Sequence, residues 1–224
     1  MDFAFFYYRP FLFCTRLLLV PFVGGYPMQT NTLTRWGGLS ALIASIVSIA
    51  IEISLLIVLG NQAYSVAALT MEWSILYTFR LIAVILLMLG LVALFTRQSK
   101  KMGIFGLVAF FIAATGTMLI FGFAWALTFT FPAMAEVVPA FLDSFAAAPS
   151  IGVVLTLFLV TIGWLLFGIA TLRAKILPAG AAWVVIVGSF LALVLNMMNL
   201  PMSWLIFDVG VIWAGWWLWK EPTA

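Results

Sequence analysis

Residues 74–128 read SILYTFRLIAVILLMLGLVALFTRQSKKMGIFGLVAFFIAATGTMLIFGFAWALT, and they decide the fold. Two apolar runs, 74–96 and 103–128, lie on either side of the basic stretch 97–101. A helix needs about 20 mostly apolar residues to cross about 30 Å of hydrocarbon, and each run is long enough. The stretch therefore predicts two membrane-spanning helices that are joined by a basic turn.

The rest of the 224-residue chain continues this pattern. It is 66% hydrophobic and 8% charged, with a mean hydropathy of +1.26, whereas a soluble domain is about half apolar and a quarter charged. This composition excludes a soluble enzyme, a nucleic-acid-binding domain and a disordered chain. Helices are expected instead of barrel strands because the apolar runs are continuous. We predict an all-α, polytopic bundle of six transmembrane helices, at 38–59, 74–96, 103–128, 151–172, 178–199 and 202–219.

Charge alternates between the two sets of connections. From residue 28 onward, the basic residues outside the predicted spans fall on one side, and they are Arg35, Arg97, Lys100, Lys101, Arg173, Lys175 and Lys220. The other connections hold Glu72, Glu136 and Asp143, with no Lys or Arg. Because basic loops stay in the cytoplasm, this pattern predicts an N-in/C-in topology in a bacterial cytoplasmic membrane, with the lipid bilayer as partner.

The segment 1–27 is aromatic and apolar, but Arg9 and Arg16 interrupt it. A seventh span here would place these two arginines outside the cell or in lipid. A signal peptide normally carries its charge before a clean apolar core, and this segment does not. We therefore expect 1–27 to be an interfacial segment or an extension upstream of a start at Met28, and 28–224 to be the transmembrane domain.

The connection 131–150 is the longest predicted outer loop. Val137, Phe141 and Phe145 recur in it at helical spacing. This spacing predicts a short amphipathic helix at the outer surface. Such a helix is either a plain connector or a lid over an outward-facing pocket.

Three ionisable residues lie within predicted spans, and they are Glu52, Arg80 and Asp208. A charge at membrane depth costs about 2.5–3.5 kcal/mol on insertion scales, so each residue is a candidate for a functional site. Each lies about 9–10 Å below the same surface, at about 1.5 Å per helical residue. We expect them to meet, with Asn196 and Asn199 at the outer end of the fifth span as further members.

Small and polar residues share a face of the first span with Glu52. They are Ala41, Ser45 and Ser48, and small residues let helices approach closely. Three interpretations of the charged cluster stay open. In the first, Arg80 pins helices together by donating hydrogen bonds to two carboxylates. In the second, its side chain extends outward to water. In the third, the cluster contacts a ligand or a proton.

Several kinds of chemistry lack the residues they need. The chain has no histidine and a single cysteine, Cys14, so imidazole-ligated metals, His-ligated haem and Ser-His or Cys-His pairs are excluded. No lysine lies deep in a span, and no phosphate-binding loop is present. We expect no enzymatic activity, no cofactor and no metal site.

Residues Gly168–Pro178 read GIATLRAKILP, with small residues ending one span, a basic loop and a proline opening the next. Together with the span pattern from Met28, this segment resembles the small, uncharacterised six-helix membrane proteins that are common in bacterial genomes. The resemblance implies a fold and a membrane location, because that group has no assigned activity or site residues.

The sequence thus predicts a non-enzymatic integral membrane protein, a structural or interaction component of the cytoplasmic membrane. The alternative is a small transporter or ligand-binding protein with a polar pocket around Arg80 in the outer leaflet. The expected partner is another membrane protein or a small molecule, and not a nucleic acid.

Overall fold

The computed structural model describes residues 30–58, 60, 62–147, 151–198 and 202–220. The chain divides into two units, 1–30 and 31–224, and the helices described below belong to the second apart from Thr30. The prediction for 1–27 lies outside the described residues. Within the described residues the structure is all-α, with no strand. The main helices are α2 (Thr30–Val58), α4 (Met71–Trp125), α7 (Ile151–Ala174), α8 (Ala179–Met197) and α9 (Leu205–Lys220).

Four helical segments are long and apolar enough to cross a membrane, and this identifies a membrane-embedded protein. They are Thr32–Ile57, Met71–Val137, Ile151–Ala174 and Ala179–Met197. The second of them contains both the second and the third predicted spans. The sixth predicted span corresponds to α9, which has 16 residues and is shorter than the roughly 20 that usually cross a bilayer.

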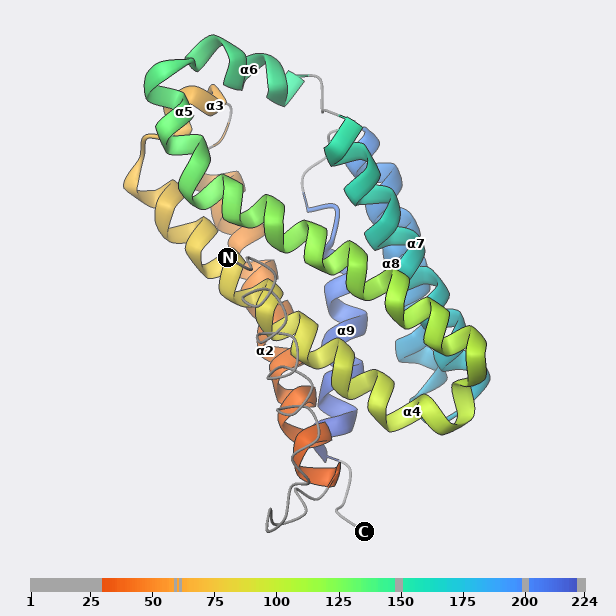
Figure 1. Cartoon of the computed structure of the whole chain (residues 1–224). Helices are drawn as coiled ribbons and strands as arrows, with labels where there is room; N and C mark the ends of the chain where they lie inside the picture. Colours follow the sequence, from red (N-terminus) through yellow and green to blue (C-terminus); the bar gives the residue numbers. More distant parts are fainter. Residues whose placement is uncertain (1–29, 59, 61, 148–150, 199–201, 221–224) are drawn as a thin grey trace, which may run out of the picture. The chain divides into compact units, whose positions relative to one another are not determined.

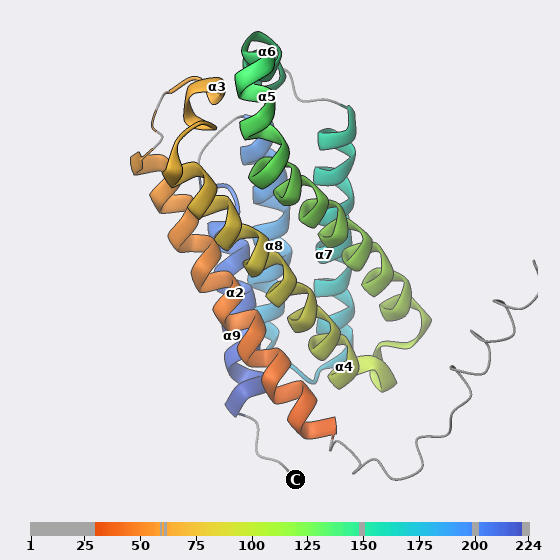
Figure 2. The same ribbon diagram turned by 60° about the vertical axis from the view of Figure 1, so that its left-hand side comes forward.

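Helix α4 reverses direction at Gly103, where φ is 61° and ψ is −160°. This conformation is essentially restricted to glycine because a Cβ atom would clash with the backbone. The reversal separates a first arm, 71–102, from a second arm, 104–125. The arms run antiparallel (Figures 1 and 2), and the rings of Phe95 and Phe110 stack across them at 4.3 Å between centroids.

A hydrogen bond closes the open end of this hairpin. The indole Nε1 of Trp73, at the start of the first arm, donates to the carbonyl oxygen of Leu127 at 2.8 Å. Leu127 lies in a π-helical turn, η2 (Ala126–Thr130), that extends the second arm. Pro132 follows this turn and has no N–H to donate to the carbonyl four residues earlier. The wider turn is the expected local response to that missing donor.

Small residues set the distances between neighbouring helices. A Cβ added to Gly90 on the first arm would lie 2.5 Å from the Cβ of Ala41 on α2. A Cβ added to Gly215 on α9 would lie 2.6 Å from the carbonyl oxygen of Gly38 on α2. Helix α2 therefore packs closely against both the first arm and α9, as small residues permit in membrane helices.

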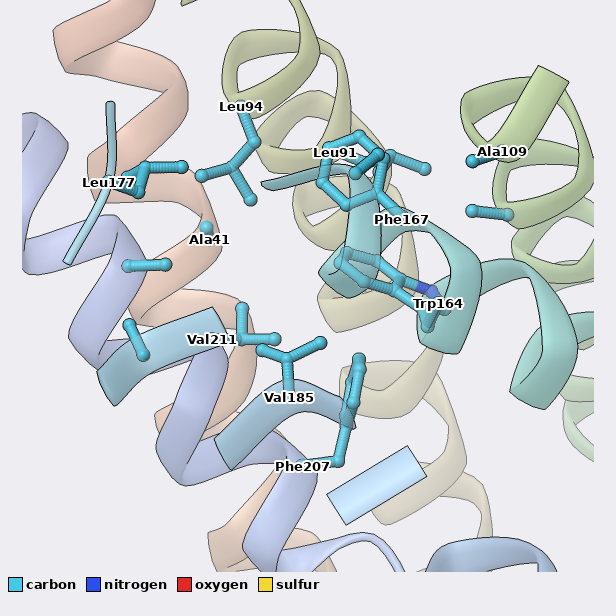
Figure 3. Packing of buried hydrophobic residues seen from close by; sticks show 14 of the residues in the cluster. Ala41, Leu91, Leu94, Ala109, Trp164, Phe167, Leu177, Val185, Phe207 and Val211 are labelled. Carbon is cyan, nitrogen blue, oxygen red and sulfur yellow. The ribbon is translucent and has the colours of Figure 1, made fainter. Parts of the chain in front are cut away.

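The core is formed by side chains from α2, both arms of α4, α7, α8 and α9. Trp164 on α7 is 1% exposed, and its Nε1 donates to Thr117 Oγ1 on the second arm at 3.2 Å. Its ring also meets the ring of Phe207 edge-on, with 5.0 Å between centroids. Val185 and Val211 fill the space between α8 and α9 (Figure 3).

The region 131–150 differs from the single amphipathic helix that we predicted. It contains two helices, α5 (Phe131–Val137) and α6 (Pro139–Ala147). Val138 separates them in a non-helical conformation, with φ −137° and ψ 57°. Proline disfavours the helical conformation of the residue before it, so Pro139 accounts for the break. Residues 148–150 lie outside the described part of the chain.

Helix α6 is tied to a one-turn helix, α3 (Tyr64–Ala67). The carboxylate of Asp143 on α6 accepts hydrogen bonds from both the backbone N and the Oγ of Ser65, each at 2.9 Å. Helices α3, α5 and α6 lie together at one end of the described unit (Figure 1). We call this the acidic end, because Glu136 and Asp143 belong to α5 and α6 and Glu72 lies in the first turn of α4.

The opposite end carries the basic residues and aromatic partners for three of them. The Arg35 guanidinium lies 5.1 Å from the ring centre of Trp219, and the Arg173 guanidinium lies 4.7 Å from the ring centre of Phe105. The Lys220 ammonium lies 4.5 Å from the Trp216 ring. The start of α2, the reversal of α4 and the end of α9 all lie at this basic end (Figure 2).

Candidate functional site

An ion pair joins α2 to the first arm of α4. Arg80 Nη1 donates to Glu52 Oε1 at 2.7 Å. The side chains remain 21% and 16% exposed, respectively. The sequence predicts this contact, because both residues lie at the same depth on antiparallel neighbours. The partial exposure shows that the pair borders open space.

That space is a cavity of about 290 Å³, which we call the upper cavity. Its polar lining includes Glu52, Arg80, Thr156 and Asn196. Its aromatic lining consists of Tyr64, Tyr77, Phe123 and Trp204, and its aliphatic lining includes Leu55, Ile120, Leu127 and Val153. At about 30 Å³ per water, a volume of this size holds about ten waters or one small organic molecule.

Asp208 on α9 does not share in the ion pair. It is 3% exposed and faces the hydroxyls of Ser45 and Ser48 on α2. Its Oδ2 atom and the Ser45 Oγ atom are buried and have no hydrogen-bond partner among the described residues. The three charged residues therefore lie near one another without sharing one salt bridge. Arg80 pairs with Glu52, and Asp208 faces Ser45 and Ser48 of α2.

Arg80 and Asp208 nevertheless line one further cavity, of about 60 Å³. We call it the lower cavity. Ser48, Thr117, Trp164 and Phe207 contribute to its walls. Arg80, Ile120 and Trp204 line both cavities, so the guanidinium stands where the two spaces adjoin.

Of the two asparagines in the predicted cluster, the structure describes Asn196 and not Asn199. Asn196 lines the upper cavity, and its Nδ2 donates to the Ala192 carbonyl at 2.8 Å and to Ser203 Oγ at 2.7 Å. These bonds tie the end of α8 to the segment that precedes α9. Asn199 lies outside the described residues.

Sequence reasoning did not single out Tyr64, Tyr77 or Trp204 as site residues. Tyr77 precedes Arg80 by three positions and so shares its helix face, which is a usable signal. Tyr64 had no such signal, because α3 reaches the cavity through the contact of Ser65 with Asp143. Burial, and to a smaller extent the charge of Glu52, raise the pKa of the Tyr64 phenol. This phenol is therefore neutral at physiological pH and can donate a hydrogen bond into the cavity.

The predicted lid, 131–150, does not contribute a described side chain to the upper cavity. The described loop residue that lines it is Tyr64. Helix α6 affects the cavity indirectly, because Asp143 holds Ser65 and thereby α3.

Within the described part of the chain, no three His, Cys, Asp or Glu side chains lie close enough together to hold a metal ion. The polar groups of the site are a guanidinium, carboxylates, phenols, hydroxyls and an amide. This set is suited to hydrogen bonding and charge pairing with a small molecule.

The described part of the chain is all-α, and four of its helical segments are long and apolar enough to cross a membrane. No protein-family model matches the chain, and neither a curated protein nor a solved structure is similar to it.

Proposed function

We propose that the two arms of α4 are separate membrane spans and that α9 is another, giving six spans. The 67 residues of Met71–Val137 would measure about 100 Å as one helix, roughly three times the hydrocarbon thickness. The reversal at Gly103 divides this length into two arms of suitable size. The last turns of the short α9 carry aromatic and basic residues that suit the membrane surface, among them Trp216 and Lys220.

The proposed orientation places the basic end in the cytoplasm, so that both termini are inside. Cytoplasmic retention of basic loops supports this orientation. The membrane that we propose is the bacterial cytoplasmic membrane. The acidic end, with the upper cavity beneath it, then faces outward.

For the role of this protein, we propose binding or transport of a small amphipathic molecule with an acidic group. The observation that carries this proposal is the upper cavity of about 290 Å³, which is bordered by both members of the ion pair. Four aromatic rings line it, which provides apolar surface for the body of a ligand. Arg80 provides a planar donor for a carboxylate or a similar group.

The main competing role is that of a structural or interaction component, in which the charges only hold helices together. A pair with that single role is expected to be enclosed by packed side chains. The exposure of Arg80 and Glu52 to a cavity favours the binding role instead. The lining of the cavity in the described part of the chain supplies groups for binding, and binding is the role that we propose.

A cysteine-accessibility experiment tests whether the cavity opens to water. In a Cys14→Ser background, Thr156→Cys places a thiol on the cavity wall. Thr161→Cys is the matched control on the same helix, at a position that is 2% exposed. A charged, membrane-impermeant thiol reagent added from outside should label Thr156→Cys and not Thr161→Cys. Equal and slow labelling of both would contradict the proposal.

A thermal-unfolding experiment tests ligand binding directly. Benzoate, benzyl alcohol and benzylamine have the same apolar ring and differ in charge. Benzoate should raise the melting temperature of the purified protein, by an amount that grows with its concentration. Thr156→Phe fills the cavity and should abolish this effect, whereas Leu155→Phe, which is exposed on the same helix, should retain it. The same shift with all three probes, or in both variants, would refute a specific acid-binding cavity.

A further inference from the structure

The lower cavity is a built polar site inside the helix bundle. Its volume of about 60 Å³ is enough for about two waters. It is too small for the molecule proposed for the upper cavity. Its walls bring together the Asp208 carboxylate, the Arg80 guanidinium and the hydroxyl-bearing residues Ser48 and Thr117.

Asp208 is the unusual member of this site. It is 3% exposed, and its Oδ2 atom has no hydrogen-bond partner among the described residues. A buried carboxylate with one oxygen left without a hydrogen-bond partner is costly when it is ionised, especially in a membrane. A proton bound to it removes the charge and adds a hydroxyl donor.

The balance of charge around Asp208 leads to the same conclusion. One guanidinium, Arg80, faces two carboxylates, Glu52 and Asp208, and its Nη1 atom is bonded to Glu52. The other elements that line the lower cavity are the second arm of α4 and helix α7, and helix α8 packs against α7 and α9. They carry no titratable side chain except Arg173, which lies at the basic end of α7. One bound proton therefore makes the three-residue cluster neutral.

We propose that Asp208 is a proton-binding site, with its proton held in the lower cavity while Arg80 is paired with Glu52. The exchange is a simple ionisation, in which a carboxylate oxygen takes up a proton from water and releases it again. No other reactant is needed. The upper cavity is the neighbouring polar space, because Arg80 and Trp204 line both cavities.

Arg80 gives the site a second state. In this state the guanidinium has left Glu52 and pairs with Asp208. Asp208 has then released its proton and is ionised, and Glu52 has taken up a proton and is neutral. The cluster then stays neutral with the proton moved toward the larger cavity. This step uses groups that are already in place, and it does not depend on which molecule occupies the upper cavity.

Infrared spectroscopy of the purified full-length protein tests the proposal, because a protonated carboxyl has a carbonyl stretch that a carboxylate lacks. At neutral pH, the difference spectrum between wild type and Asp208→Asn should contain the signal of one protonated carboxyl. Glu72→Gln, which removes an exposed acid at the start of α4, is the matched control and should leave that signal unchanged. A difference spectrum without a protonated-carboxyl signal would overturn the proposal.

A second variant keeps the test decisive if Asp208→Asn does not fold. In Glu52→Gln, Arg80 has Asp208 as its remaining carboxylate, so the protonated-carboxyl signal at neutral pH should fall. A signal of undiminished strength would contradict the shared-charge argument. This readout requires no ligand, so it can succeed even if benzoate fails to bind and the proposed function is wrong.

Discussion

Replacing Arg80 with leucine removes the sole positive charge of the cluster and leaves two carboxylates in the bundle. Breaking a buried ion pair by removing one partner costs about 3–5 kcal/mol. Since the Arg80 and Glu52 side chains are 21% and 16% exposed, water reduces that penalty. We expect Arg80→Leu to lower the free energy of unfolding by about 2–3 kcal/mol, which is at or just below the lower limit of that range.

The double variant Arg80→Leu/Glu52→Gln should recover most of this loss. It retains only Asp208, which is neutral when protonated, so the remaining cost is that of a lost hydrogen bond, about 0.5–1.5 kcal/mol. Adding Asp208→Asn to this double variant should then change stability by less than about 1 kcal/mol, because it replaces one neutral side chain with another. The control double variant Arg80→Leu/Glu72→Gln should remain as unstable as Arg80→Leu alone.

Folded yield in size-exclusion chromatography and reversible unfolding in mixed detergent micelles measure these differences. The reasoning is refuted if Arg80→Leu/Glu52→Gln is no more stable than Arg80→Leu. It is also refuted if the control double variant recovers equally, because Glu72 is exposed and outside the cluster.

Three further predictions concern the scaffold around the cavities. Gly90→Ala should destabilise the protein by about 1–3 kcal/mol, because its Cβ would lie 2.5 Å from that of Ala41. The control Gly122→Ala has no atom within 4 Å of its added Cβ, so it should be neutral or slightly stabilising in the same unfolding assay. Asp143→Ala should remove the two hydrogen bonds to Ser65 and increase amide hydrogen exchange in α3, with an unchanged exchange rate refuting the link. Gly103→Ala should cost about 1–3 kcal/mol, because φ there is 61°, and equal stability to wild type would show that the reversal tolerates a side chain.

The Glu52–Arg80 contact could be predicted because few alternatives exist in a chain with so few charges. Both residues lie the same distance from one end of adjacent antiparallel helices, and depth alone brings them together. The surroundings of Asp208 could be predicted only in part. Its depth was clear, but its orientation toward Ser45 and Ser48 depends on the close approach of α9 to α2 at Gly38 and Gly215.

The cavity walls contributed by loop segments could not be predicted from periodicity. Tyr64 belongs to a four-residue helix, which is too short to carry a periodic signal. Its position depends on a side chain 78 residues away from its neighbour Ser65, and such pairings follow from tertiary packing. The division of 131–150 at Pro139 was open to local reasoning, since proline disfavours a helical residue before it. The predicted amphipathic helix took account of apolar spacing and not of that proline.

The order of Glu52, Arg80 and Asp208 along the chain also bears on how the protein is made. A ribosome releases the chain from its N-terminus, and domains begin to fold in that order. Glu52 and Arg80 are separated by 28 residues and emerge early as part of a helical hairpin, whereas Asp208 belongs to the last helix. The guanidinium thus meets its first carboxylate long before the second has been translated. The pairing of Arg80 with Glu52 in the structure agrees with this order of synthesis.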